Sequence, residues 1–197
     1  MNTFILAETP EESAAYHCNK HVVKMILESA QMLCAAHWLH LLKDKEKTIS
    51  DFKRIRDAQD WALKNTKPDL QPPWKMSHVR HPCTVWTAEN YSNYTWQLKL
   101  CKSLLKEYEE RYSRSHKSTI VANWLEANKP LNIKKAPMSN FPVCMKEEFK
   151  VFDSMGIVDP IASYRNYYIR DKVRFAKWEP RAEIPKWFTK GVNSGRK

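Results

Sequence analysis

The sequence predicts an all-α fold, a compact bundle of four to six helices with a Pro-rich connecting loop, and three observations favour it. Long stretches repeat apolar residues at helical spacing. Only three glycines occur in 197 residues, too few for a turn-rich β fold. Thr9-Pro10 and Asp159-Pro160 each place a capping side chain directly before a proline, which is typical of helix starts. We expect a single helical domain over residues 1–190 and a flexible basic tail over residues 191–197.

The expected elements follow in order along the chain. "TPEE" at residues 9–12 predicts a helix start, with Thr9 as cap and Glu12 closing a capping box, and this helix is expected to continue to about residue 42. Residues 67–82 are rich in proline and predict the connecting loop. We expect the remaining helices over residues 49–65, 83–112, 116–128 and 160–178.

Residues 16–33, "YHCNKHVVKMILESAQML", combine a largely apolar helix with a polar stripe, which consists of His17, His21, Lys24, Glu28 and Gln31. At about 100° per residue these five lie within roughly 80° of arc on one face. A Glu28 carboxylate in a cleft beside Lys24 and His21 would have a tunable pKa, as acid–base catalysis requires. We therefore predict Glu28, His21, His17 and Lys24 as catalytic residues and Gln31 as a substrate-binding residue. The alternative is a solvated stripe in which Lys24 and Glu28 form an i,i+4 pair.

The charge of the chain indicates a polyanionic partner. There are 33 Lys and Arg against 22 Asp and Glu, a net charge of +11, which favours nucleic acid. The loop combines an aromatic ring with phosphate-binding groups, and residues 164–178 interleave basic and aromatic side chains. The candidate DNA-binding residues are Trp74, His78, Arg80, His81, Asn90, Asn93, Arg165, Tyr168, Arg170 and Lys172. The alternatives are a packed connector that buries its tryptophan and an amphipathic helix that buries its tyrosines under a basic solvated face.

Other site classes are poorly supported by the sequence. The pairs His17–His21 and His78–His81 have spacings that zinc ligands use, but no HExxH motif or cysteine cluster accompanies them, so we expect no metal and no other cofactor. Five widely spaced cysteines are expected to be reduced core residues of a cytoplasmic protein. No signal-peptide core and no apolar run of about 18 residues is present, so we expect no membrane contact.

Three features together resemble a known family. They are the spacing His21-x6-Glu28, the long helix from His81 to Arg111 and the basic, tyrosine-rich segment followed by "IPKWF". In spacing and layout they resemble the phage pyrimidine-dimer DNA glycosylases of the endonuclease V type. The resemblance implies a small, basic, all-α enzyme that flips a base out of the duplex, cleaves its glycosidic bond and then cleaves the strand in a lyase step. It also implies that Glu28 matches the catalytic carboxylate of the family and His21 its DNA-contacting histidine.

The chain departs from that family at three points. Asn2 follows Met1, where the family exposes the nucleophilic amine of a small residue. Leu27 precedes the glutamate, where an arginine is expected, and residues 43–80 form an added connector. If an imine forms, the α-amine of Met1 and the side chain of Lys24 are the candidate amines.

These observations predict a phage-type enzyme that works in the cytoplasm of the host cell on a pyrimidine base in DNA. A DNA glycosylase, with or without an AP-lyase step, is the favoured activity. One alternative is a transferase that attaches an amine to an activated thymine, with Glu28 as the base that deprotonates the amine. The other is a DNA-binding or inhibitor protein without enzymatic activity.

Overall fold

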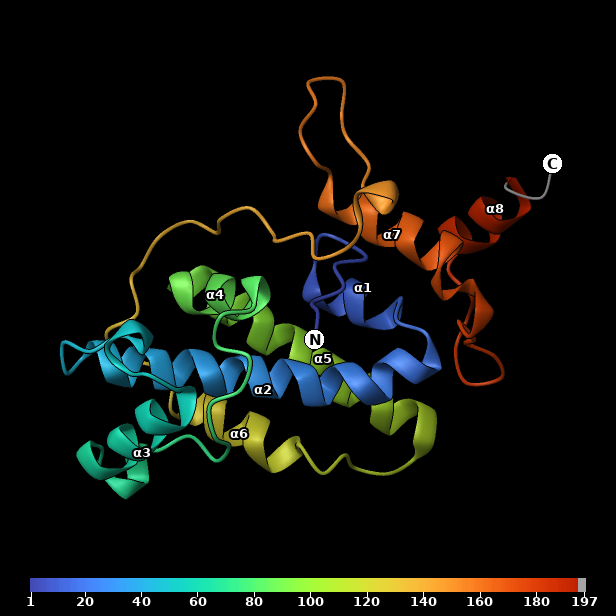
Figure 1. Cartoon of the computed structure of the whole chain (residues 1–197). Coiled ribbons are helices and arrows are strands. Elements are labelled where there is room, and N and C mark those ends of the chain that lie inside the picture. Colours follow the sequence, from blue (N-terminus) through green and yellow to red (C-terminus); the bar gives the residue numbers. More distant parts are fainter. Residues whose placement is uncertain (195–197) are drawn as a thin grey trace.

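The computed structural model describes residues 1–194, and its architecture is helical throughout (Figure 1). The predicted all-α class is confirmed, but these residues form eight α-helices, more than the four to six expected. The α-helices are α1 (Pro10–Ala15), α2 (Asn19–Lys43), α3 (Ile55–Asn65), α4 (Pro82–Glu89), α5 (Tyr91–Tyr112), α6 (Thr119–Ala127), α7 (Pro160–Arg170) and α8 (Lys186–Ser194). Short 3₁₀ turns occupy Ile49–Asp51, Pro68–Leu70, Glu147–Phe149 and Lys172–Arg174.

The first expected helix is divided into α1 and α2. Thr9 caps α1 as predicted, but the helix ends at Ala15, and the chain changes direction before α2 begins at Asn19. The Arg111 guanidinium, at the end of α5, donates hydrogen bonds of 2.9 Å to the Ala15 carbonyl and 2.7 Å to the His17 carbonyl. Carbonyl groups at a helix end need such partners. A long-range contact therefore stabilises a break that local periodicity does not reveal.

The expected helix over residues 83–112 is divided in the same way, into α4 and α5. At the break Asn90 has an extended backbone, with φ −153° and ψ 169°. Its side-chain oxygen accepts a 3.0 Å hydrogen bond from the Asn93 amide, which makes it the N-cap of α5. The next amide, of Tyr91, donates to the Lys134 carbonyl at 2.8 Å. Asn90 therefore has a structural role as the cap of α5.

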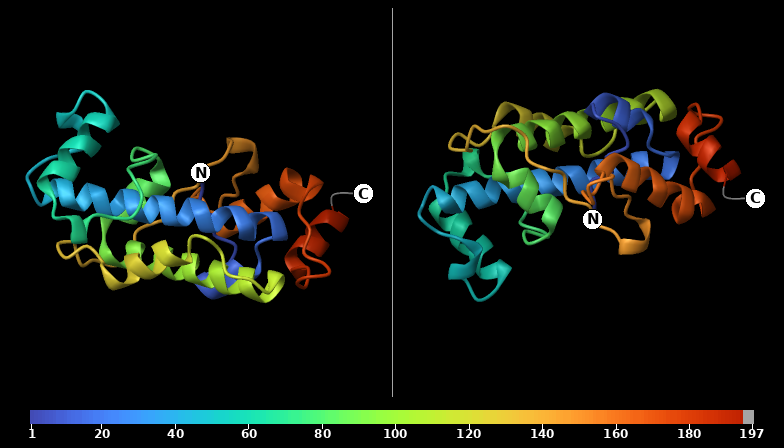
Figure 2. Two further views of the ribbon diagram at one scale, coloured as in Figure 1. Left: turned by 90° about the horizontal axis from the view of Figure 1, so that it is seen from below. Right: turned by 90° about the horizontal axis from the view of Figure 1, so that it is seen from above.

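Helix α2 forms the centre of the molecule, and α5 runs alongside it in the opposite direction (Figures 1 and 2). Helices α3 and α6 pack near the C-terminal end of α2, and α7 and α8 lie towards its N-terminal end. Three apolar clusters follow α2 from one end to the other. They include Ile26, Leu100, Tyr164 and Trp178 in the first, Leu33, Leu98 and Leu125 in the second, and Trp38, Leu42 and Ala58 in the third.

Residues 129–146, which we call the strap, form an irregular segment that crosses over α4 from the end of α6 towards α7 (Figure 1). Its backbone is held by side chains of the bundle. Trp86 donates to the Ser139 carbonyl at 3.1 Å, and the Asn93 side chain donates to Ser139 Oγ at 2.8 Å. Further along, the Cys144 carbonyl accepts a 2.9 Å hydrogen bond from the side chain of Asn2. The strap therefore joins the middle of the bundle to the start of the chain.

The C-terminal part differs from the expected tail. Asp159 caps α7 as predicted, accepting from the Ala162 amide at 2.9 Å. Residues 191–194, expected in a flexible tail, belong to α8, and residues 195–197 lie outside the described part of the chain. Gly191 lies where α8 meets α7, and a Cβ there would approach Ile169 Cδ1 to 2.3 Å. Across residues 1–194, no helix has the length and apolar character needed to cross a membrane.

Candidate functional site

A cleft of about 410 Å³ opens where the start of the chain, α2, the strap and the segment after α7 meet. Glu28 lines it and is buried, with 8% of its surface exposed. The lining residues are Met1, Asn2 and Phe4; Lys20, His21, Lys24, Met25 and Glu28 of α2; Cys144 of the strap; and Tyr167, Lys172, Arg174 and Phe175. The predicted catalytic carboxylate therefore faces a cleft and not open solvent.

The Glu28 carboxylate is surrounded by nitrogen atoms. Its Oε2 accepts a 2.9 Å hydrogen bond from the Asn2 amide and lies 3.8 Å from the α-amino nitrogen of Met1. Its Oε1 lies 3.2 Å from Lys24 Nζ. The side chain of Met1 is 2% exposed, whereas that of Lys24 is 62% exposed. Lys24 Nζ is thus within reach of direct proton exchange with the carboxylate, whereas the α-amino nitrogen of Met1 is an ion-pair neighbour that would need one bridging water.

His21 contributes a neutral imidazole to the cleft wall. Its Nδ1 and the Tyr168 hydroxyl are hydrogen-bonded at 2.5 Å, and its ring packs against Phe4 and Phe175, with centroids 4.6 and 5.3 Å away. Burial lowers the pKa of His21 to about 3, and the charges of His17 and Lys172 add to the shift. At neutral pH this histidine therefore binds through hydrogen bonds and ring contacts, without a positive charge.

The polar stripe is divided between three environments. His21, Lys24 and Glu28 line the cleft. His17 is completely buried, and its Nδ1 is hydrogen-bonded to the Ser13 carbonyl at 2.7 Å. Burial lowers the pKa of His17 to about 4, so it too is neutral. Gln31 is half-buried and does not line the cleft, so the structure brings together three of the five stripe residues.

Positive charges and one aromatic ring surround the entrance. The four cationic side chains of the cleft are Lys20, Lys24, Lys172 and Arg174. Lys20 Nζ and the Arg174 guanidinium lie 4.9 and 5.2 Å from the centroid of the Phe175 ring. Lys172 Nζ is bonded to Tyr167 at 3.0 Å. Lys24 pairs with Glu28 and Lys172 pairs with Asp171 at 2.8 Å, while exposed Lys20 and Arg174 lie over the Phe175 ring. This excess of positive charge favours an anionic ligand.

The other predicted residues of the C-terminal segment have structural contacts. Arg165 Nε donates to the Leu6 carbonyl at 2.8 Å, and its guanidinium lies over the rings of Tyr16 and Trp187. Arg170 is exposed and donates to the Glu148 carbonyl. Tyr168 is completely buried beneath His21, so it is out of reach of a base. Of the basic residues predicted in this segment, Lys172 is the one that lines the cleft.

The predicted residues of the loop before α4 lie in different surroundings. Trp74 is half-buried and lines a groove of about 720 Å³ together with Lys24, Arg114, His116 and Lys117. Because Lys24 also lines the cleft, this groove continues the basic surface across α2. His78 and Arg80 are exposed and line neither hollow, and His81 accepts from the Cys83 amide at 3.2 Å as the cap of α4.

The two predicted asparagines are structural residues in the bundle. Asn90 is 2% exposed and caps α5. Asn93 is completely buried, where its side chain donates to the Trp86 carbonyl at 2.8 Å and accepts from the Ser139 amide at 3.1 Å. Neither lines the cleft, so neither is placed to contact a ligand there.

Several residues of the cleft were not predicted. Lys20 had a usable signal, because Lys20, Lys24 and Glu28 follow each other at i, i+4 and i+8 on one helix face. Asn2 and Cys144 had none, since they belong to segments without helical periodicity. No protein-family model, curated protein or solved structure matches the chain. Function is therefore inferred from the chemistry of the cleft.

Proposed function

We propose that the protein is a DNA glycosylase that acts on a pyrimidine base, with Glu28 as its catalytic carboxylate. The observation that supports this most directly is the pairing of a buried carboxylate with two amines, 3.2 and 3.8 Å away, inside a basic cleft. Amine-driven glycosylases need this pairing, because the amine must lose a proton before it can attack carbon.

DNA fits the charge and size of the cleft. Exposed Lys20 and Arg174 provide positive charge for phosphate groups beside the Lys24–Glu28 and Lys172–Asp171 pairs. A volume of about 410 Å³ is that of a site for a small organic group and too small for a duplex. The substrate base would therefore be flipped out of the helix into the cleft, beside the Phe175 ring.

The reaction follows from these contacts. Glu28 accepts a proton from the amine, whose lone pair forms a bond to C1′ of the deoxyribose. The C1′–N bond to the base breaks, and the base leaves with that electron pair and is protonated by solvent. The nitrogen, now bound to C1′, loses a proton to solvent, and its lone pair expels O4′, which takes up the proton held by Glu28. This ring opening gives a cationic imine, and the carboxylate, ionised again, stabilises it. Loss of a proton from C2′ then expels the 3′ phosphate in the lyase step.

The two amines differ in their surroundings. A lysine becomes a nucleophile at neutral pH when its site is desolvated, but the side chain of Lys24 is 62% exposed. The α-amino nitrogen of Met1 belongs to a residue with a 2% exposed side chain and lies on the same carboxylate oxygen as the Asn2 amide. Both amines remain candidates, and mapping of the trapped peptide distinguishes them.

Borohydride trapping tests the proposal. The protein is incubated with duplex DNA that carries a thymine dimer or an abasic site, and reduction converts an imine into a stable adduct. We expect an adduct and strand cleavage with the wild type, and loss of both by at least about 100-fold in Glu28→Gln. Peptide mapping of the adduct identifies the amine.

Glu110→Gln is the matched control, because Glu110 is an exposed glutamate paired with Lys106 far from the cleft, and it should behave as the wild type. DNA binding without adduct or cleavage by the wild type would overturn the glycosylase proposal. That outcome would favour the transferase, in which Glu28 deprotonates an incoming amine, or a protein that only binds DNA.

A further inference from the structure

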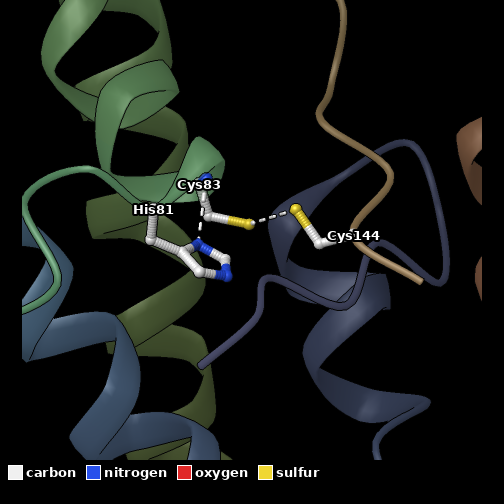
Figure 3. Close-up of side chains that lie close together, drawn as sticks. All are labelled: His81, Cys83 and Cys144. Atoms are coloured by element: carbon white, nitrogen blue, oxygen red, sulfur yellow. Dashed lines mark hydrogen bonds between the residues drawn. The ribbon is translucent and has the colours of Figure 1, made fainter. Parts of the chain in front are cut away.

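Two cysteines and a histidine that are distant in sequence meet beside the cleft (Figure 3). His81 caps α4, Cys83 lies in its first turn, and Cys144 belongs to the strap, 61 residues later. The two Sγ atoms are 3.7 Å apart, and a ring nitrogen of His81 and both sulfurs lie within 4.8 Å of one another. Figure 3 shows the two thiols pointing toward each other with the imidazole beside Cys83.

The separation of the sulfur atoms indicates the kind of site. A disulfide requires about 2.05 Å between its sulfurs. Two thiolates bound to one tetrahedral zinc ion, with Zn–S bonds of about 2.3 Å, lie about 3.8 Å apart. The 3.7 Å found here matches the zinc geometry, and two thiolates with one imidazole are donors that select zinc over magnesium or calcium.

We propose that Cys83, Cys144 and His81 bind one zinc ion. Cys83 is buried, whereas Cys144 and His81 are half-buried, and Cys144 lines the cleft, so an ion can enter from that side. Three protein ligands leave a fourth position for water. His81 Nδ1 accepts a rather long 3.2 Å hydrogen bond from the Cys83 amide, which a small rotation of the ring exchanges for a bond to the metal.

The surrounding contacts support a built site. Asn2 Oδ1 accepts from the Tyr164 hydroxyl at 2.7 Å and lies 3.6 Å from Cys83 Sγ. The Asn2 side chain also donates to the Cys144 carbonyl at 2.9 Å. Outer contacts of this kind orient metal ligands. The Asn2 backbone amide also donates to Glu28. A zinc ion bound to Cys144 would therefore fix the strap next to Asn2, and through Asn2 next to the Glu28 carboxylate.

This inference does not depend on the glycosylase proposal, and it differs from the metal expectation. The sequence argued against a metal because its cysteines are dispersed and its histidine pairs stand alone. The cluster instead takes one histidine from a predicted pair and adds two cysteines that only the fold brings together.

Metal titration of the full chain tests the site. Protein stripped with a chelator is titrated with Co²⁺ under reducing conditions, then with Zn²⁺. We expect one equivalent of Co²⁺ per chain, with the intense visible bands of a tetrahedral thiolate site, and displacement of Co²⁺ by Zn²⁺. At 100 times the dissociation constant, Zn²⁺ should raise the melting temperature by about 5–10 °C.

Variants identify the ligands. Cys144→Ser, a change at a half-buried position, and His81→Ala should each abolish the tetrahedral Co²⁺ spectrum, and circular dichroism reports whether the variants fold. Cys34→Ala, which removes a buried cysteine of α2 outside the cluster, should keep one equivalent. The proposal is overturned if the wild type shows no tetrahedral spectrum or if folded Cys144→Ser keeps it. A Cys83–Cys144 disulfide that survives the reductant, detected by mass, would overturn it equally.

Discussion

Glu28 shows how much a single side chain depends on its neighbours. In a solvated stripe it would be one half of an exposed i,i+4 pair with Lys24, worth a few tenths of a kcal/mol. In the structure one carboxylate oxygen faces Lys24 and the other faces the Asn2 amide and the Met1 amine. The fold thus gives Glu28 two nitrogen neighbours from the start of the chain in addition to Lys24. These neighbours distinguish its carboxylate from that of an exposed surface pair.

Buried His17, between α1 and α2, predicts how stability depends on pH. Burial lowers the pKa of His17 to about 4, against about 6.5 in an unfolded chain. As pH falls through 6.5 the unfolded chain binds a proton that the folded chain does not, so the free energy of unfolding decreases until about pH 4. At about 1.4 kcal/mol per pKa unit, the loss from His17 is on the order of 3 kcal/mol.

Urea denaturation between pH 4.5 and 7.5 measures this slope. His17→Gln, which retains a group able to donate to the Ser13 carbonyl, should make the slope shallower. Part of the slope should persist, because burial also lowers the pKa values of His21, His37 and His40. Exposed His78, replaced by Gln, provides the control and should leave it unchanged. An equally steep slope in His17→Gln would contradict the assignment.

A second prediction at the residue scale concerns the contribution of the Tyr168 hydroxyl group to stability. It is bonded to His21 Nδ1 at 2.5 Å, and the tyrosine is completely buried. Tyr168→Phe leaves that nitrogen without its partner and should lower the free energy of unfolding by about 1–2 kcal/mol. Chemical denaturation measures the change. Tyr91→Phe is the comparison: its hydroxyl has no hydrogen bond to the protein within residues 1–194, so a change below about 0.5 kcal/mol is expected.

At the scale of the element, helix starts were predicted better than helix interruptions. Thr9-Pro10 and Asp159-Pro160 cap α1 and α7 because the capping bond lies within a few residues of sequence. The breaks before α2 and α5 depend on Arg111 and on the Lys134 carbonyl, both distant in sequence. Periodicity continues through both breaks and does not locate them, although Asn90, a residue type that commonly caps a helix, is a local signal for the second break.

Arg111 provides the element-scale prediction. Its side chain is 1% exposed, and it joins the end of α5 to the break between α1 and α2 and to Glu107. Arg111→Met should lower the free energy of unfolding by about 3 kcal/mol, because buried carbonyls and a partly buried carboxylate lose their partner.

The matched control is Lys106→Met on the same helix. Lys106 forms an exposed i,i+4 pair with Glu110 at 3.7 Å, and its removal should cost less than about 0.5 kcal/mol. Guanidinium chloride melts compare the two variants. Equal midpoints would show that Arg111 does not hold the break together.

At the scale of the whole molecule, the distribution of the positive charge suggests where a polyanion would bind. The net charge of +11 predicts a polyanionic partner without saying where it binds. The structure places Lys20, Lys24, Lys172 and Arg174 around the cleft, while Lys45 and Lys47 are exposed just past α2, near α3. Lys20 and Arg174, which are exposed, can therefore be compared with exposed Lys45 and Lys47 within one chain.

Charge reversal at these sets predicts different salt dependence. If DNA lies over the cleft, Lys20→Glu with Arg174→Glu should weaken binding and reduce the slope of log K against log salt by about 2. Lys45→Glu with Lys47→Glu makes the same change in net charge and should leave the slope nearly unchanged. Fluorescence anisotropy with labelled duplex DNA from low to moderate salt measures both. Equal losses would indicate that binding is not localised at the cleft.

The candidate site was predictable in part. The spacing of His21, Lys24 and Glu28 places them on one helix face, and they do line one cleft. Asn93 and Tyr168 were misplaced in the prediction because a polar or aromatic group on an apolar face can equally satisfy a buried partner. The opposite wall of the cleft depends on which segments meet, and that is a property of topology.

The cleft combines the beginning of the chain with residues that are synthesised much later. Asn2 is bonded to the carbonyl of Cys144, 142 residues away, and the far wall extends to Phe175. A chain that ends before the strap therefore contains Glu28 with its neighbours Asn2 and Lys24 but lacks the wall formed by Cys144, Lys172, Arg174 and Phe175. We expect such a fragment to have no cleft beside the carboxylate.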